Sequence, residues 1–93
     1  GIIEGMHYAK AAYIITDKKE RVAQEIMDMN RGVTLIDARG AYTGERRDMV
    51  FCVVSKKEIV EVKELVRRID PRAFVIVSDV REVLGEGFME YRQ

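Results

Sequence analysis

Arginines, glycines and hydroxyl residues occur together between positions 31 and 47, in the runs Arg31-Gly-Val-Thr and Gly40-Ala-Tyr-Thr-Gly-Glu-Arg-Arg. A guanidinium group donates paired hydrogen bonds to a phosphate or carboxylate, and glycine-rich backbone exposes further amide donors. The candidate ligand-binding residues are Arg31, Gly32, Thr34, Arg39, Gly40, Tyr42, Thr43, Gly44, Arg46 and Arg47. Their chemistry predicts a site for an anionic metabolite or nucleotide.

These residues also have a plainer interpretation. Gly32 suits the end of a helix, and Gly40 and Gly44 can simply satisfy the turn geometry of a solvated hairpin. Tyr42 lies between the two loop glycines, where an aromatic ring suits a base stack or a contact with a neighbouring subunit equally well. The threonines are common in strands and turns without any binding role. The residues alone leave both interpretations open.

No second group of residues predicts catalysis or a metal site. His7 has no cysteine or carboxylate cluster beside it, and Cys52 falls in the most apolar segment, where a thiol behaves as a small hydrophobe. The aspartates Asp37, Asp48 and Asp79 show no spacing that pairs two carboxylates for acid–base chemistry. We therefore expect no enzymatic activity, no cofactor and no metal.

The charge balance limits the partners. Sixteen basic and sixteen acidic side chains cancel, so no overall field attracts nucleic acid or acidic lipid. Lys63, Arg67 and the neighbouring cations are interleaved with glutamates, a pattern typical of a solvated helix face. No apolar run reaches the roughly 18 residues that span a bilayer, so the chain as given is expected to be soluble.

The elements that must position the arginine-rich loop alternate strands with helices. Apolar runs predict strands at 8–16, 33–39, 48–54 and 73–78. Apolar residues at helical spacing predict one helix at about 18–29 and a second helix that follows Ser55 and ends before Pro71. Asn30 or Gly32 can supply the left-handed residue that ends the first helix. The loop of interest, 40–47, therefore joins the second strand to the third.

Local signals also mark the helix boundaries. Asp17 with Glu20, and Ser55 with Glu58, have the spacing of the capping box that opens a helix. Pro71 ends the second helix, because the residue before a proline is pushed out of the helical region. Both helices are thus bounded by signals of known physical origin.

The order strand, helix, strand, strand, helix, strand is the split arrangement called ferredoxin-like, an α+β sandwich. Right-handed crossovers place both helices on one face of a four-stranded antiparallel sheet. Runs 49–54 and 74–77 present apolar side chains to both faces, whereas a sheet wetted on one side should alternate. We expect another subunit to cover the second face, which predicts a homo-oligomer. Residues 1–7 are interpreted as a linker and 8–93 as a single domain.

Several motifs occur in a recognisable order. They are Tyr13-Ile-Ile-Thr-Asp, Arg31-Gly-Val-Thr, Gly40-Ala-Tyr-Thr-Gly, Val53-Val-Ser, Asp70-Pro-Arg-Ala-Phe-Val-Ile-Val-Ser-Asp-Val and Gly85-Glu-Gly-Phe. With this series the chain resembles, from about residue 4 to 88, the C-terminal cytosolic domain of the YitT family of bacterial membrane proteins. The resemblance implies a domain of unknown function at the cytoplasmic face of the cell membrane, with 1–7 as the junction after a multi-pass membrane region.

The resemblance also implies a fold similar to the PII signalling proteins, which are trimers that bind nucleotides in clefts between subunits. PII proteins contact their targets through the loop between the second and third strands, which here is 40–47 and is far shorter. A dimer or trimer with an intersubunit site for an anionic small molecule, attached to the membrane part of a longer protein, is therefore expected. The alternative is a ligand-free oligomerisation domain that assembles the membrane portions. Neither interpretation involves nucleic acid.

Overall fold

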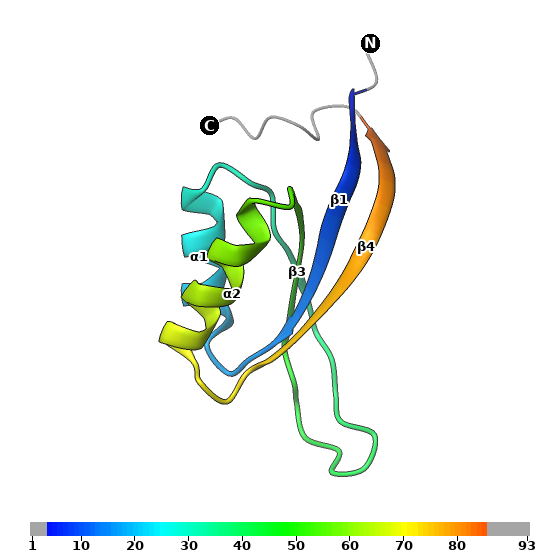
Figure 1. Cartoon of the computed structure of the whole chain (residues 1–93). Coiled ribbons are helices and arrows are strands. Elements are labelled where there is room, and N and C mark those ends of the chain that lie inside the picture. Colours follow the sequence, from blue (N-terminus) through cyan, green and yellow to red (C-terminus); the bar gives the residue numbers. More distant parts are fainter. Residues whose placement is uncertain (1–3, 86–93) are drawn as a thin grey trace.

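The computed structural model describes residues 4–85, which form six elements. In chain order these are β1 (Glu4–Ile15), α1 (Lys19–Asp28), β2 (Thr34–Ile36), β3 (Met49–Val54), α2 (Glu58–Ile69) and β4 (Phe74–Gly85). The strands form one antiparallel sheet in the order β2-β3-β1-β4, and both helices lie on one of its faces (Figure 1). This is the α+β ferredoxin-like arrangement that the sequence predicts.

The strand lengths differ from the prediction. β1 begins at Glu4, so residues 4–7, which we expected to be linker, lie in a strand and pair with β4. β4 continues to Gly85 instead of ending at 78, and β2 has three residues where 33–39 was predicted. The long pairing of β1 with β4 joins the two ends of the chain, which no local pattern can reveal. The rest of the expected linker, 1–3, and the tail 86–93 lie outside the described residues.

The hydrophobic core lies between the helices and the covered face of the sheet. Burial alternates along β3, because successive strand residues point to opposite faces. The helices contribute residues that recur at helical spacing. The largest fully buried side chains are Ile14, Val22, Ile26, Val50, Val54, Val62 and Val66. Full burial of a side chain of this kind contributes about 1.5–3 kcal/mol to the free energy of unfolding.

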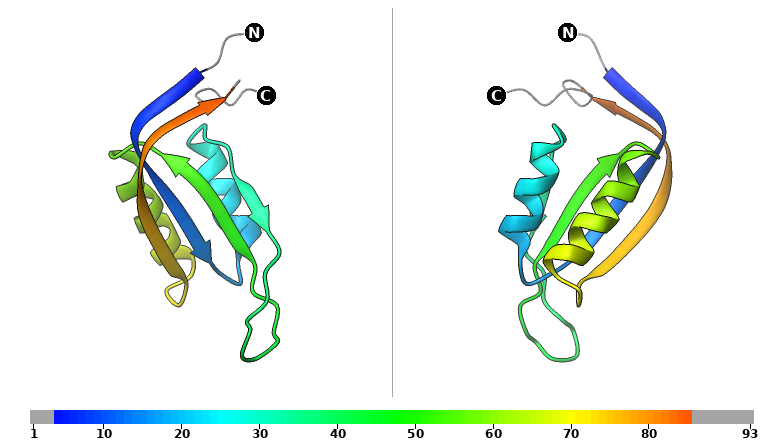
Figure 2. Two further views of the ribbon diagram at one scale, coloured as in Figure 1. Left: turned by 90° about the vertical axis from the view of Figure 1, so that its right-hand side faces the viewer. Right: turned by 60° about the vertical axis from the view of Figure 1, so that its left-hand side comes forward.

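No helix or strand of the described residues covers the second face of the sheet (Figure 2). This face carries apolar side chains. Ile36, Phe74 and Ile76 are 39, 66 and 51% exposed. In an antiparallel ladder, directly paired residues share a face, and Tyr13 is paired with both Phe51 and Ile76. The Tyr13 and Phe51 rings pack with their centroids 5.0 Å apart. This open face, as we call it below, has the apolar character that the strand sequences predict.

The predicted capping box of Ser55 and Glu58 forms in the turn that leads into α2, whose own cap position, Lys57, has no side-chain cap. The Ser55 Oγ accepts a hydrogen bond from the Glu58 amide at 3.2 Å, and the Glu58 Oε1 accepts one from the Ser55 amide at 2.8 Å. Arg31 Nε donates to both carboxylate oxygens of Glu58 at 3.0 Å. Arg31, in the connection after α1, is therefore bonded to the first turn of α2, and the side chains of Arg31 and Glu58 are about four-fifths buried.

Helix α1 begins without a capping box and ends before a left-handed residue. The predicted pair of Asp17 and Glu20 forms no capping box, since the cap position is Lys18 and no side chain caps the helix. The Thr16 Oγ1 instead accepts the Lys18 amide at 3.0 Å, so this hydroxyl organises the turn before the helix. At the other end, Asn30 has φ +68°, so of the two candidates Asn30 and Gly32 it is Asn30 that supplies the left-handed residue.

Replacing the capping serine tests the contribution of the capping box to stability. We expect Ser55→Ala to lower the free energy of unfolding by about 1 kcal/mol, because the Glu58 amide loses its acceptor. Urea denaturation followed by circular dichroism measures the change. Ser78→Ala, an equivalent substitution at an exposed strand position, should change stability by no more than about 0.5 kcal/mol. Equal effects of the two variants would contradict the prediction.

The Glu58 carboxylate should also make stability depend on pH. Burial alone would raise its pKa, but hydrogen bonds from Ser55 and Arg31 outweigh burial and hold the pKa below its ordinary value of 4.5. A lowered pKa gives stability that is present above pH 4.5 and lost as the pH falls through and below that value. Glu58→Gln keeps a capping side chain but cannot ionise, so its unfolding free energy should fall less than that of the wild type. Denaturation curves at neutral and acidic pH check this, and parallel losses would show that Glu58 is not responsible.

Candidate functional site

The loop between β2 and β3 continues the two strands as an irregular hairpin that projects from the end of the sheet (Figure 1). Arg39 and Arg46 form an isolated bridge, and the Arg47 amide donates to the Ala38 carbonyl at 2.7 Å. Residues opposite one another in such a bridge point to the same side of the ribbon, whereas the next residue points to the other. The predicted arginines therefore lie on both sides of the hairpin.

The two glycines of the loop shape its tip. Gly40 donates to the Glu45 carbonyl and Gly44 donates to the Gly40 carbonyl, both at 2.8 Å. Gly44 has φ +74°, and a Cβ on Gly40 would lie 2.9 Å from Thr43 Oγ1. Turn geometry thus accounts for both glycines, and in this conformation their amides donate within the loop. Tyr42 at the tip is fully exposed.

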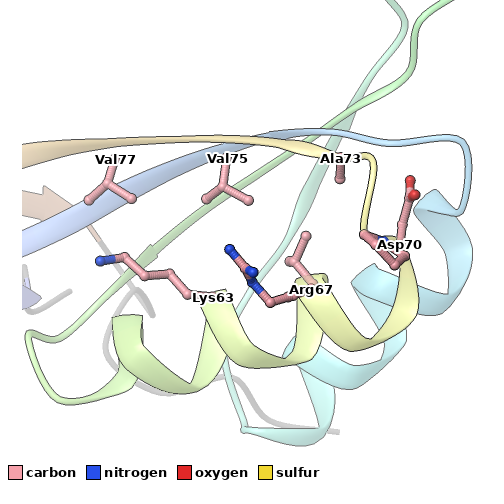
Figure 3. A pocket seen from close by; sticks show the side chains of 8 residues that line it. Lys63, Arg67, Asp70, Ala73, Val75 and Val77 are labelled. Atoms are coloured by element: carbon pink, nitrogen blue, oxygen red, sulfur yellow. The ribbon is translucent and has the colours of Figure 1, made fainter.

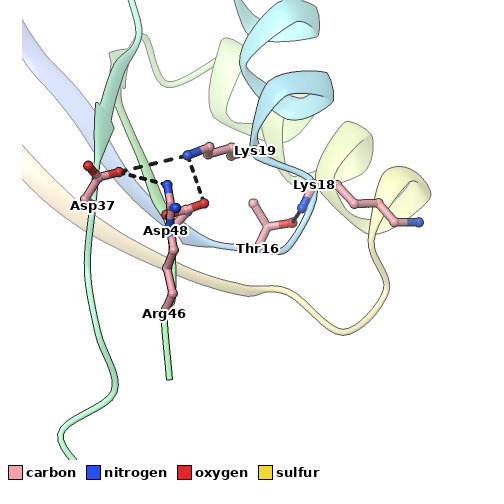
Figure 4. A network of polar contacts seen from close by, with 6 residues as sticks. All are labelled: Thr16, Lys18, Lys19, Asp37, Arg46 and Asp48. Carbon is pink, nitrogen blue, oxygen red and sulfur yellow. Dashed lines mark hydrogen bonds and ion pairs between the residues drawn. The ribbon is translucent and has the colours of Figure 1, made fainter. Parts of the chain in front are cut away.

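An ion-pair network holds the base of the hairpin against α1 (Figure 4). Asp48 accepts from Arg46 Nε at 2.9 Å and pairs with Lys19 Nζ at 2.9 Å. Asp37 lies 3.5 Å from Arg46 Nη2 and 3.9 Å from Lys19 Nζ. Lys19 and then Arg46 lower the pKa of Asp48 from its ordinary range. Two cations meet two carboxylates, so the charge of Arg46 is matched within the network.

A cavity of about 390 Å³ lies beside this network, where the hairpin, the end of β1 and the start of β4 meet. It is lined by Ile15, Thr16, Asp17, Glu45, Arg46, Arg47, Asp70, Arg72 and Phe74. We call it the sheet-end cavity. Three arginines and three carboxylates line it, and two of the arginines, Arg47 and Arg72, make no ion pair among residues 4–85. Arg47 comes from the hairpin, whereas Arg72 comes from the turn after α2.

Hydrogen bonds hold the floor of the sheet-end cavity in place. Thr16 is buried, and its hydroxyl donates to Asp70 Oδ2 at 2.7 Å. The Arg72 amide donates to Asp70 Oδ1 at 3.1 Å. The bond from Thr16, followed by the backbone donors, lowers the pKa of Asp70. Asp70 therefore joins the turn after β1 to the turn before β4, and its charge is satisfied by neighbouring donors.

The structure separates the predicted ligand-binding residues. Arg31 and Gly32 follow α1 and lie beyond the far end of β3, where Arg31 binds Glu58. Thr34, the first residue of β2, pairs with Phe51 at the end of the β2–β3 ladder that lies away from the hairpin. Arg31 and the loop arginines, which the sequence groups in one candidate site, are not brought together, because the six-residue strand β3, about 20 Å long, lies between them. Figure 1 shows the two places at opposite ends of the sheet.

The arginines within the hairpin are also divided. Arg39 and Gly44 line an open hollow of about 520 Å³ together with Asp37, Ala38 and Arg46. Arg47 lines the sheet-end cavity, and Arg46 lines both. The predicted cluster of Arg39, Arg46 and Arg47 thus does not converge on a single point.

Sequence reasoning missed the residues that the other turns bring to the sheet-end cavity. Arg72, Asp70 and Phe74 were assigned to the end of a helix and the start of a strand. The strand order of the predicted fold could have revealed these residues, because it makes β1 and β4 antiparallel neighbours. The end of β1 and the start of β4 must then meet at the sheet end from which the hairpin projects.

Three further observations concern the cysteine, metal binding and membrane spans. Cys52 is buried, and this burial, followed by the nearby Glu58, raises the pKa of its thiol to about 11. Within residues 4–85, no group of three or more His, Cys, Asp or Glu side chains is arranged to hold a metal ion. No helix in the same range is long and apolar enough to cross a bilayer.

Comparison with known sequences identifies relatives. Residues 31–85 match the family described as "Uncharacterized protein conserved in bacteria (DUF2179)". The chain is 49% identical over 88 residues to the UPF0750 membrane protein YpjC of Bacillus subtilis (strain 168), covering 94% of this chain and 30% of YpjC. It is 30% identical over 84 residues to the UPF0750 membrane protein YitT of that strain, covering 89% of this chain and 30% of YitT. The resemblance to the YitT family is confirmed, and the chain spans less than a third of these relatives.

Solved structures agree with the fold. A DUF2179 protein of Eubacterium ventriosum is 34% identical, with a TM-score of 0.65 over 75% of this chain and 97% of its own. A protein of Thermus thermophilus described as PII-like is 15% identical, with a TM-score of 0.70 over 94% of this chain and 98% of its own. The PII-like protein CPII of Thiomonas intermedia K12, solved with ADP, AMP and bicarbonate, is 12% identical, with a TM-score of 0.54 over 89% of this chain and 94% of its own. The fold is therefore PII-like, and because its family match covers more than half of its length, the chain belongs to the DUF2179 family of bacterial proteins.

Proposed function

We propose that this chain is a regulatory domain that binds an anionic metabolite or nucleotide in the sheet-end cavity. The observation that carries the proposal is the pair Arg47 and Arg72, which line one cavity from two different turns and make no ion pair among residues 4–85. Each guanidinium offers paired donors to a phosphate or carboxylate. An anion between them would neutralise two charges that the described part of the chain leaves unmatched.

The rest of the cavity supports a ligand with both a charged and a flat apolar part. Asp70 is held by Thr16 and by the Arg72 amide, so the turn that carries Arg72 is ordered before any ligand arrives. Phe74 is 66% exposed at the same cavity and offers an aromatic surface for stacking. A nucleotide has both parts. CPII, which shares the fold at low identity, was solved with ADP, AMP and bicarbonate, so nucleotides are the first class to test.

Binding would be coupled to the hairpin through Arg46. This side chain lines the sheet-end cavity and also holds Asp48 and Asp37 in the ion-pair network. An anion in the cavity would compete with these carboxylates for Arg46 and so favour a different hairpin position. The signal requires only that the ligand bind one hairpin position more tightly than the other.

The relatives suggest where such a signal would go. The names of YpjC and YitT describe them as membrane proteins, and this chain corresponds to less than a third of each. We assign the domain to the cytoplasmic face of the membrane, where it would report the ligand to the membrane part of a longer protein. We assign it no catalytic role.

Thermal-shift measurements with nucleotides, cyclic dinucleotides and small dicarboxylates test the ligand site. A ligand at about a hundred times its dissociation constant should stabilise the wild type by about 2.7 kcal/mol. Arg47→Ala and Arg72→Ala should remove most of this gain, because each loses paired hydrogen bonds to the anion. Arg39→Ala removes the same charge from the opposite side of the hairpin and should retain the gain.

Two results would contradict the ligand proposal. One is the absence of any stabilising compound for the wild-type chain. The other is a ligand whose effect survives in both Arg47→Ala and Arg72→Ala, since that ligand must bind elsewhere.

The open face favours a second function, the assembly of longer proteins through self-association. Ile36, Phe74 and Ile76 form an exposed apolar surface, which a second copy of the chain would bury. Phe74 and Ile15 belong to this face and also line the sheet-end cavity. A copy on the open face would therefore border the ligand, as in the expected intersubunit site. We propose a dimer or trimer on this basis.

A charge on the open face should break the oligomer. Ile76→Asp places a carboxylate where a second copy would pack, and the 51% exposure of Ile76 lets the folded chain accept it. Sedimentation velocity should show the wild type as an oligomer and this variant as a monomer with unchanged circular dichroism. Val60→Asp introduces the same charge at a 54% exposed position on α2 and should leave the oligomer intact. A monomeric wild type, or equal effects of both variants, would contradict assembly through the open face.

A further inference from the structure

A groove of about 310 Å³ lies between α2 and β4, on the helix side of the sheet (Figure 3). Its floor is apolar and is formed by Val66, Ala73, Val75 and Val77. Val77 remains 37% exposed, because α2 does not cover the edge strand completely. The groove is lined further by Lys63, Arg67, Asp70 and Pro71. We call it the β4 groove.

Two cations border the β4 groove. Lys63 and Arg67 lie one helical turn apart on α2, and Figure 3 shows both side chains extending into the space beneath Val75 and Val77. Neither makes an ion pair among residues 4–85. The sequence pattern assigned them to a solvated helix face, but the fold sets them beside an apolar floor. Asp70, the acid of the groove, is already bonded to Thr16. The described part of the chain therefore leaves positive charge in the groove without a matching carboxylate.

The outer edge of β4 borders the same groove. β4 is the last strand in the order β2-β3-β1-β4, and its ladder partner is β1. Along such an edge, half of the backbone N–H and C=O groups point away from the sheet and can pair with another strand. The apolar floor, the two cations and the outer strand edge, with which no strand of residues 4–85 pairs, thus lie next to one another.

We propose that the β4 groove is a docking site for an extended segment of a partner polypeptide, which adds to the outer edge of β4 and carries a carboxylate between apolar side chains. In strand addition, backbone hydrogen bonds supply affinity and the alternate side chains supply specificity. Every second side chain of the added strand would face α2, with apolar groups over Val75 and Val77 and the carboxylate at Lys63 and Arg67. The proposal uses Lys63 and Arg67, neither of which lines the anion site, and does not depend on that site.

The remaining side chains of the added strand, which point away from α2, would lie beside Phe74 and Ile76 on the open face. A small free anion would use the cations but neither the strand edge nor the valines. With two cations and one acid along the groove, the charge is also too small for strong attraction to an anionic membrane. A peptide uses all three features of the groove.

The test uses the full 93-residue chain labelled with ¹⁵N and the capped peptide Ser-Val-Thr-Glu-Thr-Val-Ser as the probe. Its two valines and its glutamate fall on one face of a strand. We expect titration to shift the backbone amide resonances of 73–77 and of the α2 residues Lys63 and Arg67. A peptide with glutamine in place of glutamate should bind about tenfold more weakly, because the charged hydrogen bonds are lost.

Variants of the chain locate the contact. Lys63→Ala and Arg67→Ala should each weaken binding of the glutamate peptide but hardly change binding of the glutamine peptide. Val77→Lys, at a position already 37% exposed, should abolish binding of both peptides while circular dichroism stays unchanged. Arg21→Ala removes an equal charge from the exposed surface of α1 and should leave the affinity unaltered.

Several outcomes would overturn the proposal. No saturable shift at millimolar peptide, or shifts confined to residues outside β4 and α2, would show that the groove does not dock a strand. Equal affinity for the glutamate and glutamine peptides would remove the role of the two cations. If free N-acetylglutamate produces the same shifts along 73–77, the groove binds a small anion and not an added strand.

Discussion

Helices α1 and α2 can cover only one face of the four-stranded sheet, and the other features depend on this constraint. The core is complete on the covered face, where Ile14, Val50 and Val62 have no exposure. The uncovered face keeps apolar side chains in contact with water, which is the basis of the proposed association with another copy. Even on the covered side, α2 stops short of the edge strand, and a cationic groove remains along β4.

The end of the sheet concentrates the polar chemistry, because three connections meet there. The turn after β1, the hairpin before β3 and the turn before β4 bring together charges that lie far apart in the sequence. Some of these charges are satisfied internally, as with Asp48 between Lys19 and Arg46. Arg47 and Arg72 differ, since they line a cavity without an ion pair in the described part of the chain. This difference separates the arginines of the ion-pair network from those that we propose as the ligand-binding pair.

Asp70 links the two proposed binding surfaces. Its carboxylate lines both the sheet-end cavity and the β4 groove, and its bonds from Thr16 and from the Arg72 amide fix the turn between them. A ligand on Arg72 and a strand docked on β4 would therefore contact opposite sides of one turn. Coupling between the surfaces would need two positions of that turn with different affinities. The open face meets the same region through Phe74, so all three surfaces converge at the start of β4.

The sequence by itself determined the order of the elements, the one-sided helix layer, the capping box of Ser55 and Glu58, and the apolar character of both sheet faces. These features follow from periodicity and from contacts between residues close in the chain. Only the tertiary structure decided that Arg31 binds Glu58 far from the hairpin, that Arg72 joins Arg47, and that Lys63 borders a groove. The reason is physical: strand order and register bring distant residues together, and a local pattern contains no information about partners many residues away.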